Sequence, residues 1–301
     1  MIVALSDWQN KSRALYQALT AAGHHVVDRH EPADVLLIDT DYGVGHYRPT
    51  LRLHRDYGSR IFLYTHGKDA FLGWDGIWEP WEVDGYLTFA PGIKHVMKSY
   101  ATPYPNPVHV IGWWYCEQKP FIGGLNPRRV LFAPWHPHQG GYLPSELKAL
   151  NARILDELLD TFPAEAITVR YLHHLENNGL TELPGVTYTQ GHADNSVADL
   201  DAADLVVGCG TFSLLSIARG KPTIMFGQDI QPHESYHDGH YQPVASWERY
   251  RHMMHYPFEW DEKPSIEAVM CVEPVFWKQQ FIGPAFDAGA FIKILEKKAN
   301  G

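Results

Sequence analysis

The chain has 301 residues, which is long for one α/β domain and sufficient for two domains that each bury a core. It carries 25 Lys and Arg against 35 Asp and Glu, a net charge of −10, which excludes a general attraction to nucleic acid or to anionic membranes. Its three cysteines lie far apart in the sequence, which excludes a disulfide framework and a zinc ribbon.

The first apolar run is too short for a signal peptide, and no apolar run approaches the roughly 20 residues that a membrane span needs. The sparse cysteines also fit a reducing compartment. We therefore expect a soluble cytoplasmic protein.

The first part of the chain alternates short apolar strands with amphipathic helices. Strands are expected at residues 2–5, 26–27, 35–38, 61–64, 85–89 and 108–111, and helices at 11–22 and 91–100. This alternation predicts a parallel, doubly wound sheet. The loop after the first strand lacks the Gly-x-Gly-x-x-Gly fingerprint, which argues against a dinucleotide site there.

Titratable side chains directly follow two of these strands. Asp39 and Asp41 come after strand 35–38, and His66 comes after strand 61–64. His66 is our candidate general base because its intrinsic pKa lies near neutrality. Either Asp39 or Asp41 could act as the base or orient it, and Asp41 is the candidate catalytic residue of the two. The structural alternative for each is a side chain that only caps the following helix.

The strand and helix pattern begins again after residues 116–126, which contain a proline and two consecutive glycines typical of a linker. Strands are expected at 130–133, 167–171, 186–188, 205–207 and 223–226, and helices at 144–159, 197–203 and 214–219. From residue 230 we expect irregular structure until a last helix near 289–298. These elements predict an N-terminal domain at 1–120, a second domain at 127–270, and a segment at 271–301 that can pack back on the first.

A glycine-bearing turn is expected between strand 205–207 and helix 214–219. Its candidate ligand-binding residues are Gly208, Gly210, Thr211, Phe212 and Ser213. Backbone N–H groups and the positive end of a helix dipole would stabilise an anion such as phosphate at this position. The alternative is an ordinary connection between two strands that binds no ligand.

Other polar residues of the second half are candidates for contacts to phosphate or sugar. They are His136 and His138, in the loop after strand 130–133, and Arg170, at the end of strand 167–171. Packing in a proline turn is the alternative for the two histidines, and a solvated charge is the alternative for Arg170.

Three further histidines have a spacing that could hold a metal ion. They are His233, His237 and His240. Pro232 and Gly239 favour a loop over a helix in this segment, so no metal site is predicted.

Segments of both halves resemble glycosyltransferases of the two-domain B-type (GT-B) fold. Residues 203–226 resemble their donor-binding segment: Ala-Asp, an apolar strand, a Gly-rich turn, a helix, Gly-Lys-Pro and another strand. Residues 130–138 are similar to the start of that domain in teichoic-acid glycerophosphotransferases and nucleotide-sugar 2-epimerases. Residues 64–70 are similar to the Trp-His-Gly segment of the glycerophosphotransferases, in which the histidine is the proposed base.

The resemblance implies two Rossmann-like domains facing across a cleft, with the acceptor bound by the N-terminal domain and the donor by the C-terminal one. Asp229 matches the place where related enzymes put an acid that contacts the sugar. Leu215 stands where they commonly carry an acid that holds the donor ribose. The implied activity is transfer of a sugar from a nucleotide sugar, with a UDP-sugar as the expected donor, to a hydroxyl acceptor, without a cofactor.

Four alternatives stay open at this point: a nucleotide-sugar 2-epimerase, a polyol-phosphate transferase, a glucosyltransferase acting on a hydroxylated DNA base, and a non-catalytic nucleotide-sugar-binding module. An epimerase needs several acids around the sugar ring, so Leu215 counts against it. The acidic net charge disfavours DNA without excluding nucleic acid as the acceptor, because only the local field of the binding site matters.

Overall fold

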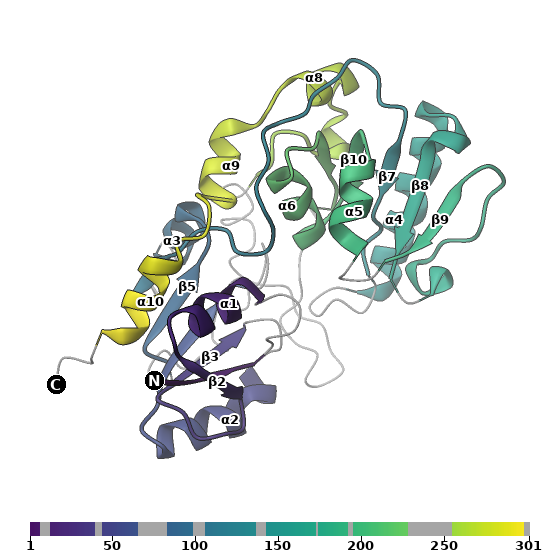
Figure 1. Cartoon of the computed structure of the whole chain (residues 1–301). Coiled ribbons are helices and arrows are strands. Elements are labelled where there is room, and N and C mark those ends of the chain that lie inside the picture. The colour runs from purple at the N-terminus through teal and green to yellow at the C-terminus, as the bar shows by residue number, and fades with distance from the viewer. Residues whose placement is uncertain are drawn as a thin grey trace. The chain divides into compact units, whose positions relative to one another are not determined.

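The computed structural model describes residues 1–6, 13–39, 44–65, 83–98, 106–136, 143–172, 174–191, 195–227 and 255–297. The chain, which Figure 1 colours by residue number, divides into two compact units. Unit 1 comprises residues 1–117 and 278–301, and unit 2 comprises residues 118–277. Unit 2 is therefore continuous in sequence, whereas unit 1 takes its last helix from the C-terminal part of the chain.

Unit 1 contains a six-stranded parallel sheet. Its strands are β1 (Ile2–Leu5), β2 (His25–Asp28), β3 (Val35–Asp39), β4 (Arg60–Tyr64), β5 (Gly85–Thr88) and β6 (Val108–Val110), and its helices include α1 (Arg13–Ala21), α2 (Val44–Asp56), α3 (Pro91–Lys98) and α10 (Ala288–Glu296). The strand order is β2-β1-β3-β4-β5-β6. All four residues of β5 and the last four of β4 are buried, which is typical of parallel strands covered on both faces.

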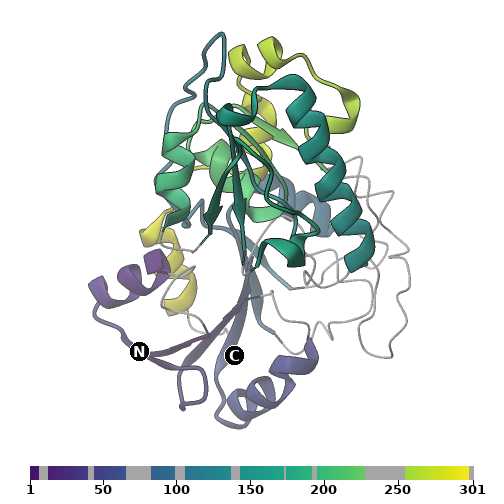
Figure 2. The same ribbon diagram turned by 90° about the vertical axis from the view of Figure 1, so that its right-hand side faces the viewer.

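Unit 2 contains a five-stranded parallel sheet. Its strands are β7 (Val130–Phe132), β8 (Ile167–Tyr171), β9 (Thr187–Gln190), β10 (Leu205–Gly208) and β11 (Thr223–Met225), and its helices include α4 (Pro144–Thr161), α5 (Ser196–Ala202), α6 (Gly210–Ala218) and α8 (Ile266–Cys271). The strand order is β11-β10-β7-β8-β9. Figure 2 shows α4 on one side of this sheet and α5 and α6 on the other.

The core of unit 2 follows from the alternation of side chains along its strands. Val130 and Phe132 of β7 pack with α4, whereas Leu131 between them packs with Leu200 of α5 and with Phe212 of α6. Successive side chains of a strand point to opposite faces, so an almost uninterrupted apolar sequence is buried on both.

The prediction of an α/β protein with two parallel sheets is confirmed. In unit 2, β7 is central, the chain moves outward through β8 and β9, and then crosses back to β10 and β11. Such a reversal between two neighbouring strands is the place where open parallel sheets bind ligands, outside the carboxyl ends of the strands. None of the helices in the described ranges has the length and hydrophobicity that crossing a membrane requires.

Two expectations about local structure were wrong. Residues 230–301 were expected to be irregular until the last helix, but α8 and α9 (Val275–Phe281) lie in the described part of this segment. They have six and seven residues, too few for a helical period to be recognised. The helix α2 was not predicted, because Pro49 lies inside it and proline is unfavourable in a helix interior.

The carboxyl end of α6 has the hydrogen bonds of a Schellman motif. The N–H of Gly220 donates to the carbonyl of Ile217 at 3.0 Å, and the N–H of Lys221 donates to the carbonyl of Ser216 at 3.0 Å. Gly220 adopts a φ of +71°, a backbone conformation that residues with a Cβ rarely adopt. The Gly-Lys-Pro segment therefore ends the helix, as the sequence predicts.

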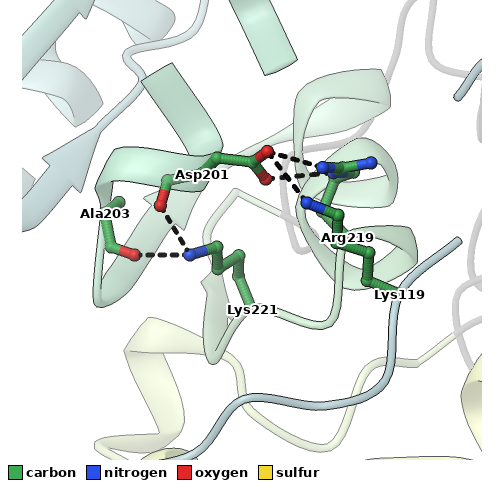
Figure 3. A network of polar contacts seen from close by, with 5 residues as sticks. All are labelled: Lys119, Asp201, Ala203, Arg219 and Lys221. Atoms are coloured by element: carbon green, nitrogen blue, oxygen red, sulfur yellow. Dashed lines mark hydrogen bonds and ion pairs between the residues drawn. The ribbon is translucent and has the colours of Figure 1, made fainter. Parts of the chain in front are cut away.

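A network of charges surrounds this helix end (Figure 3). The guanidinium of Arg219 donates two hydrogen bonds to the carboxylate of Asp201, at 3.0 and 2.5 Å, and Lys119 donates a third at 3.1 Å. The ammonium of Lys221 donates to the carbonyls of Asp201 and Ala203, both at 2.9 Å. The Arg219 hydrogen bond holds the pKa of Asp201 below its ordinary value. The network thus joins the ends of α5 and α6 to the segment that enters unit 2.

The helix α10 is held in unit 1 by an arginine at its carboxyl end. Arg60 of β4 donates hydrogen bonds to the carbonyls of Leu295, at 2.8 Å, and Lys297, at 2.6 Å. A cation at this end also interacts favourably with the helix dipole. At the other end, the carboxylate of Asp287 accepts from the N–H of Ala290 at 2.8 Å and caps the helix.

We expect unit 1 to lose stability in mild acid because of His109. Burial lowers the pKa of this histidine below its ordinary value of 6.5, and the nearby cations Lys94, Lys297 and Arg60 lower it further. The unfolded chain then binds the proton more readily than the folded chain, so the free energy of unfolding falls as the pH drops from about 6.5 through the folded pKa. Urea unfolding at pH 7.5 and 5.5 measures this loss, which should be smaller in His109→Gln. An equal loss in both proteins would contradict it.

Candidate functional site

The candidate site lies where β7 and β10 end side by side in unit 2. The N–H of Ala133 donates to the carbonyl of Val207 at 2.9 Å, so the sheet pairing continues up to the two loops. These loops start at Ala133 and Gly208 and flank the reversal in strand order. The sheet therefore brings together two segments that the sequence singled out separately, the one that contains His136 and the one from Gly208 to Ser213.

The predicted glycine turn at residues 208–213 is corrected by the structure, because α6 begins at Gly210 and not at Leu214. Cys209 before it is extended, with φ −136° and ψ 168°, and Gly210 turns the chain with a φ of +53°. This left-handed glycine completes the turn within one residue, so the helix can start at once. Consequently Thr211, Phe212 and Ser213 form the first helical turn.

The N–H groups of Gly210, Thr211 and Phe212 therefore lie at the carboxyl edge of the sheet, whereas the N–H of Ser213 donates to the carbonyl of Cys209 at 3.4 Å. The first four N–H groups of an α-helix have no partner within the helix, and the helix dipole places partial positive charge at this end. The segment from Gly210 to Ser213 contains no acidic residue that would repel an anion. The arrangement favours a phosphate or another anion as a ligand.

Ser213, in the same helical turn, carries a buried hydroxyl. Its side chain is fully buried, and its Oγ has no hydrogen-bond partner among the described residues. A Cβ built at Gly208 would lie 3.2 Å from this Oγ, so the hydroxyl packs closely against the backbone of β10. A buried hydroxyl without a partner is unfavourable unless a ligand or a water supplies one.

On the β7 side, the backbone before His136 is clamped by a buried asparagine. The amide oxygen of Asn151 accepts from the N–H of Trp135 at 2.7 Å. Its amide nitrogen donates to the carbonyls of Trp135, at 2.8 Å, and Asn178, at 3.0 Å. Asn151 is fully buried on α4, and the half-buried His136 directly follows the clamped residue. The clamp fixes the point at which the loop leaves the sheet.

A second close contact joins this loop to the end of β11. Gly227 has a φ of +72°, and a Cβ built there would lie 2.4 Å from the Trp135 ring. Sequence reasoning missed both Gly227 and Asn151. The signal for Asn151 was a polar residue among the apolar positions of the helix expected at 144–159.

Arg170 is buried, and the alternative of a solvated charge is wrong. Only 6% of this residue is exposed, and its Nε donates to Asp199 Oδ2 at 2.8 Å. Its Nη2 donates to Ser196 Oγ at 2.8 Å and to Asn195 Oδ1 at 3.2 Å. The guanidinium carbon lies 4.7 Å from the ring centre of Phe212. Two predicted site residues, from β8 and α6, are therefore in contact.

Several predicted residues lie outside the described residues. They are Asp41, His66, His138, Asp229, His233, His237 and His240. The last described residue before His66 is Thr65, whose carbonyl accepts from the hydroxyl of Tyr115 at 2.8 Å. In the described part of the chain, no cluster of three His, Cys, Asp or Glu residues could hold a metal ion.

No protein-family model and no curated protein matches the sequence. The chain is similar to solved glycosyltransferases. The structure of spinosyn rhamnosyltransferase SpnG with spinosyn aglycone is 14% identical, with a TM-score of 0.43 over 75% of this chain and 80% of that one. Glycosyltransferase VinC in complex with dTDP is 12% identical, with a TM-score of 0.43 over 99% and 92%.

A plant structure, Phytolacca americana UGT2 with UDP-2-fluoroglucose and pterostilbene, is 12% identical, with a TM-score of 0.40 over 94% of this chain and 72% of that one. The assignment of two Rossmann-like parallel sheets rests on the strand orders themselves.

Proposed function

We propose that this protein transfers a sugar from a nucleotide sugar to a hydroxyl acceptor, and that unit 2 binds the donor. The observation that carries the proposal is the buried hydroxyl of Ser213, which has no hydrogen-bond partner among the described residues, in the first turn of α6 at the reversal in strand order. A helix N-terminus, two glycines and a hydroxyl at this edge suit a diphosphate.

The chemistry requires stabilisation of negative charge on the leaving group. When the bond between the sugar and the diphosphate breaks, its electron pair stays on the diphosphate oxygen. The N–H groups of the first turn of α6 and the hydroxyls of Thr211 and Ser213 would stabilise this charge. His136, His138 and Asp229 are the proposed contacts to the phosphate and the sugar.

In an inverting transfer, a base must take the proton from the acceptor hydroxyl as its oxygen attacks the anomeric carbon. We propose His66 as this base, with Asp41 to orient it. Both follow neighbouring strands of unit 1, β4 and β3, directly at their carboxyl ends. An acceptor site in unit 1 and a donor site in unit 2 would divide the two substrates between the sheets.

Nucleotide binding tests the donor site. We expect one of UDP, GDP, CDP or dTDP to bind the full chain selectively in isothermal titration calorimetry, with UDP as the first candidate. Ser213→Ala should weaken that binding by about tenfold, the effect of one lost hydrogen bond to a charged group. The loss of stability should be small, because this hydroxyl has no hydrogen-bond partner in the described part of the chain.

Ser216 on the same helix is the matched control. It is also fully buried, but its Oγ lies 2.7 Å from Thr223 Oγ1. Ser216→Ala should therefore lower stability by about 1 kcal/mol and leave nucleotide affinity unchanged. Failure of all four nucleotides to bind, or equal effects of the two alanine variants on affinity, would overturn the proposal.

A further inference from the structure

We propose that Arg170 serves the donor site as a positioning residue: it fixes the ring of Phe212, and thereby the first turn of α6, without contacting the donor. This inference rests on the proposed function of the same site. It assigns the buried cation a role in keeping the anion-binding turn in one geometry, and it makes Phe212 the side chain through which that role acts.

The first step is that the guanidinium is enclosed by protein groups. Its Nε and Nη2 donate to Asp199, Asn195 and Ser196 of the segment that begins α5. On the Nη1 side, a Cβ built at Gly191 would lie 2.5 Å from that nitrogen, so the backbone of Gly191 closes this edge. A donor phosphate would have to displace these groups to reach the cation.

The second step is that one face of the guanidinium lies against Phe212. The separation of 4.7 Å between its carbon and the ring centre is that of a cation–π contact. Phe212 is half-buried and also packs against the apolar cluster of Leu131, Leu200, Ala203 and Val206. The ring is therefore held by contacts with both an apolar cluster and a planar cation.

The third step connects the ring to the candidate site. Phe212 lies between Thr211 and Ser213, so a rotation of its backbone would move the N–H groups and the hydroxyls that we assign to the diphosphate. An exposed helix end usually frays, and its first turn has the fewest hydrogen bonds to resist it. Anchoring the central side chain of that turn reduces this freedom before a ligand binds.

The arrangement also explains why a charged residue is buried at the end of β8. Burial of an ion is unfavourable unless it is paired and its donors are satisfied, and a buried ion pair contributes little net stability. An apolar side chain would fill the same space without the free-energy cost of burying a charge. It could not, however, make directional contacts with β8, α5 and the start of α6 at once, as the planar guanidinium does.

Affinities for UDP and UMP, measured by calorimetry on the full chain, distinguish positioning from direct contact. Through positioning, Arg170→Met and Phe212→Leu should each weaken both ligands by a similar factor, about tenfold, and the double variant should be no weaker than the worse single one. Arg170→Lys should resemble Arg170→Met, because lysine lacks the planar fork. Asp199→Asn leaves the arginine in place and should weaken the affinity for both ligands by a smaller, similar factor. This variant tests the inference if Arg170→Met does not fold.

Three results would overturn the inference: a loss for UDP much larger than for UMP in Arg170→Met, affinity retained in Arg170→Lys but lost in Arg170→Met, or additive effects in the double variant. Each indicates a cation that acts directly on phosphate or independently of Phe212. If the wild-type chain binds neither ligand nor any of GDP, CDP and dTDP, the proposed function itself fails, and the inference fails with it. If the wild type binds nucleotide but the effects of Arg170→Met and Phe212→Leu on affinity are additive, the inference fails and the proposed function stands.

Discussion

Gly220→Ala is expected to lower the free energy of unfolding of unit 2 by about 2–5 kcal/mol. The residue has a φ of +71°, and the missing Cβ would lie 1.9 Å from the carbonyl oxygen of Pro120. The carbonyl of Gly220 itself accepts from the N–H of Ile122 at 2.7 Å, so the two backbones cannot separate without breaking a hydrogen bond. Both conformational strain and steric overlap therefore oppose the substitution.

Two comparisons separate these causes in urea unfolding. Gly23 has a φ of +78° with no atom within 4 Å of a built Cβ, so Gly23→Ala measures the conformational strain alone, about 1–2 kcal/mol. In Gly220→Asn, the asparagine tolerates the left-handed conformation better than alanine does, but it also has a Cβ that would overlap the Pro120 carbonyl. This variant should be nearly as unstable as Gly220→Ala. Equal stability of Gly220→Ala and Gly23→Ala would show that the Pro120 segment moves away without loss.

His66→Ala is expected to reduce the release of nucleoside diphosphate from the donor by about 10²- to 10⁴-fold and to leave nucleotide affinity unchanged. A general base acts on the acceptor hydroxyl in the transition state and contributes nothing to donor binding in unit 2. The loss should therefore appear in kcat and not in the dissociation constant of the nucleotide.

The matched control is His25→Ala, which removes an exposed histidine from β2 in the same unit and should leave both quantities unchanged. Unchanged turnover in His66→Ala would remove this residue from the mechanism. Loss of nucleotide affinity together with turnover would instead assign it a role in folding or in donor binding.

The architecture could be predicted from the sequence because parallel strands are short apolar runs between helices with clear ends. Each of the eleven strands of the described structure coincides with or overlaps a predicted one. Gly220 also marked the end of α6 correctly. Three expectations stay predictions: that the two sheets face each other across a cleft, where the domains begin and end, and what the site residues do.

The errors came from contacts that a sequence does not display. The start of α6 depended on a left-handed φ at Gly210, and a glycine followed by Thr-Phe-Ser reads equally well as a loop. The burial of Arg170 depended on Asn195, Ser196 and Asp199, which are more than 20 residues away along the chain. The clamp by Asn151 likewise joins residues that only the folded sheet brings together.

The division of the chain has a consequence for the order in which its parts can fold during synthesis. Unit 2 is complete once residue 277 has been made, but unit 1 needs α10, which Arg60 holds by its last carbonyls. Because synthesis runs from the N-terminus, the contacts between this sheet and α10 can form only after the ribosome has made all of unit 2. The unit whose sheet is synthesised first is therefore the second to have all of its residues available.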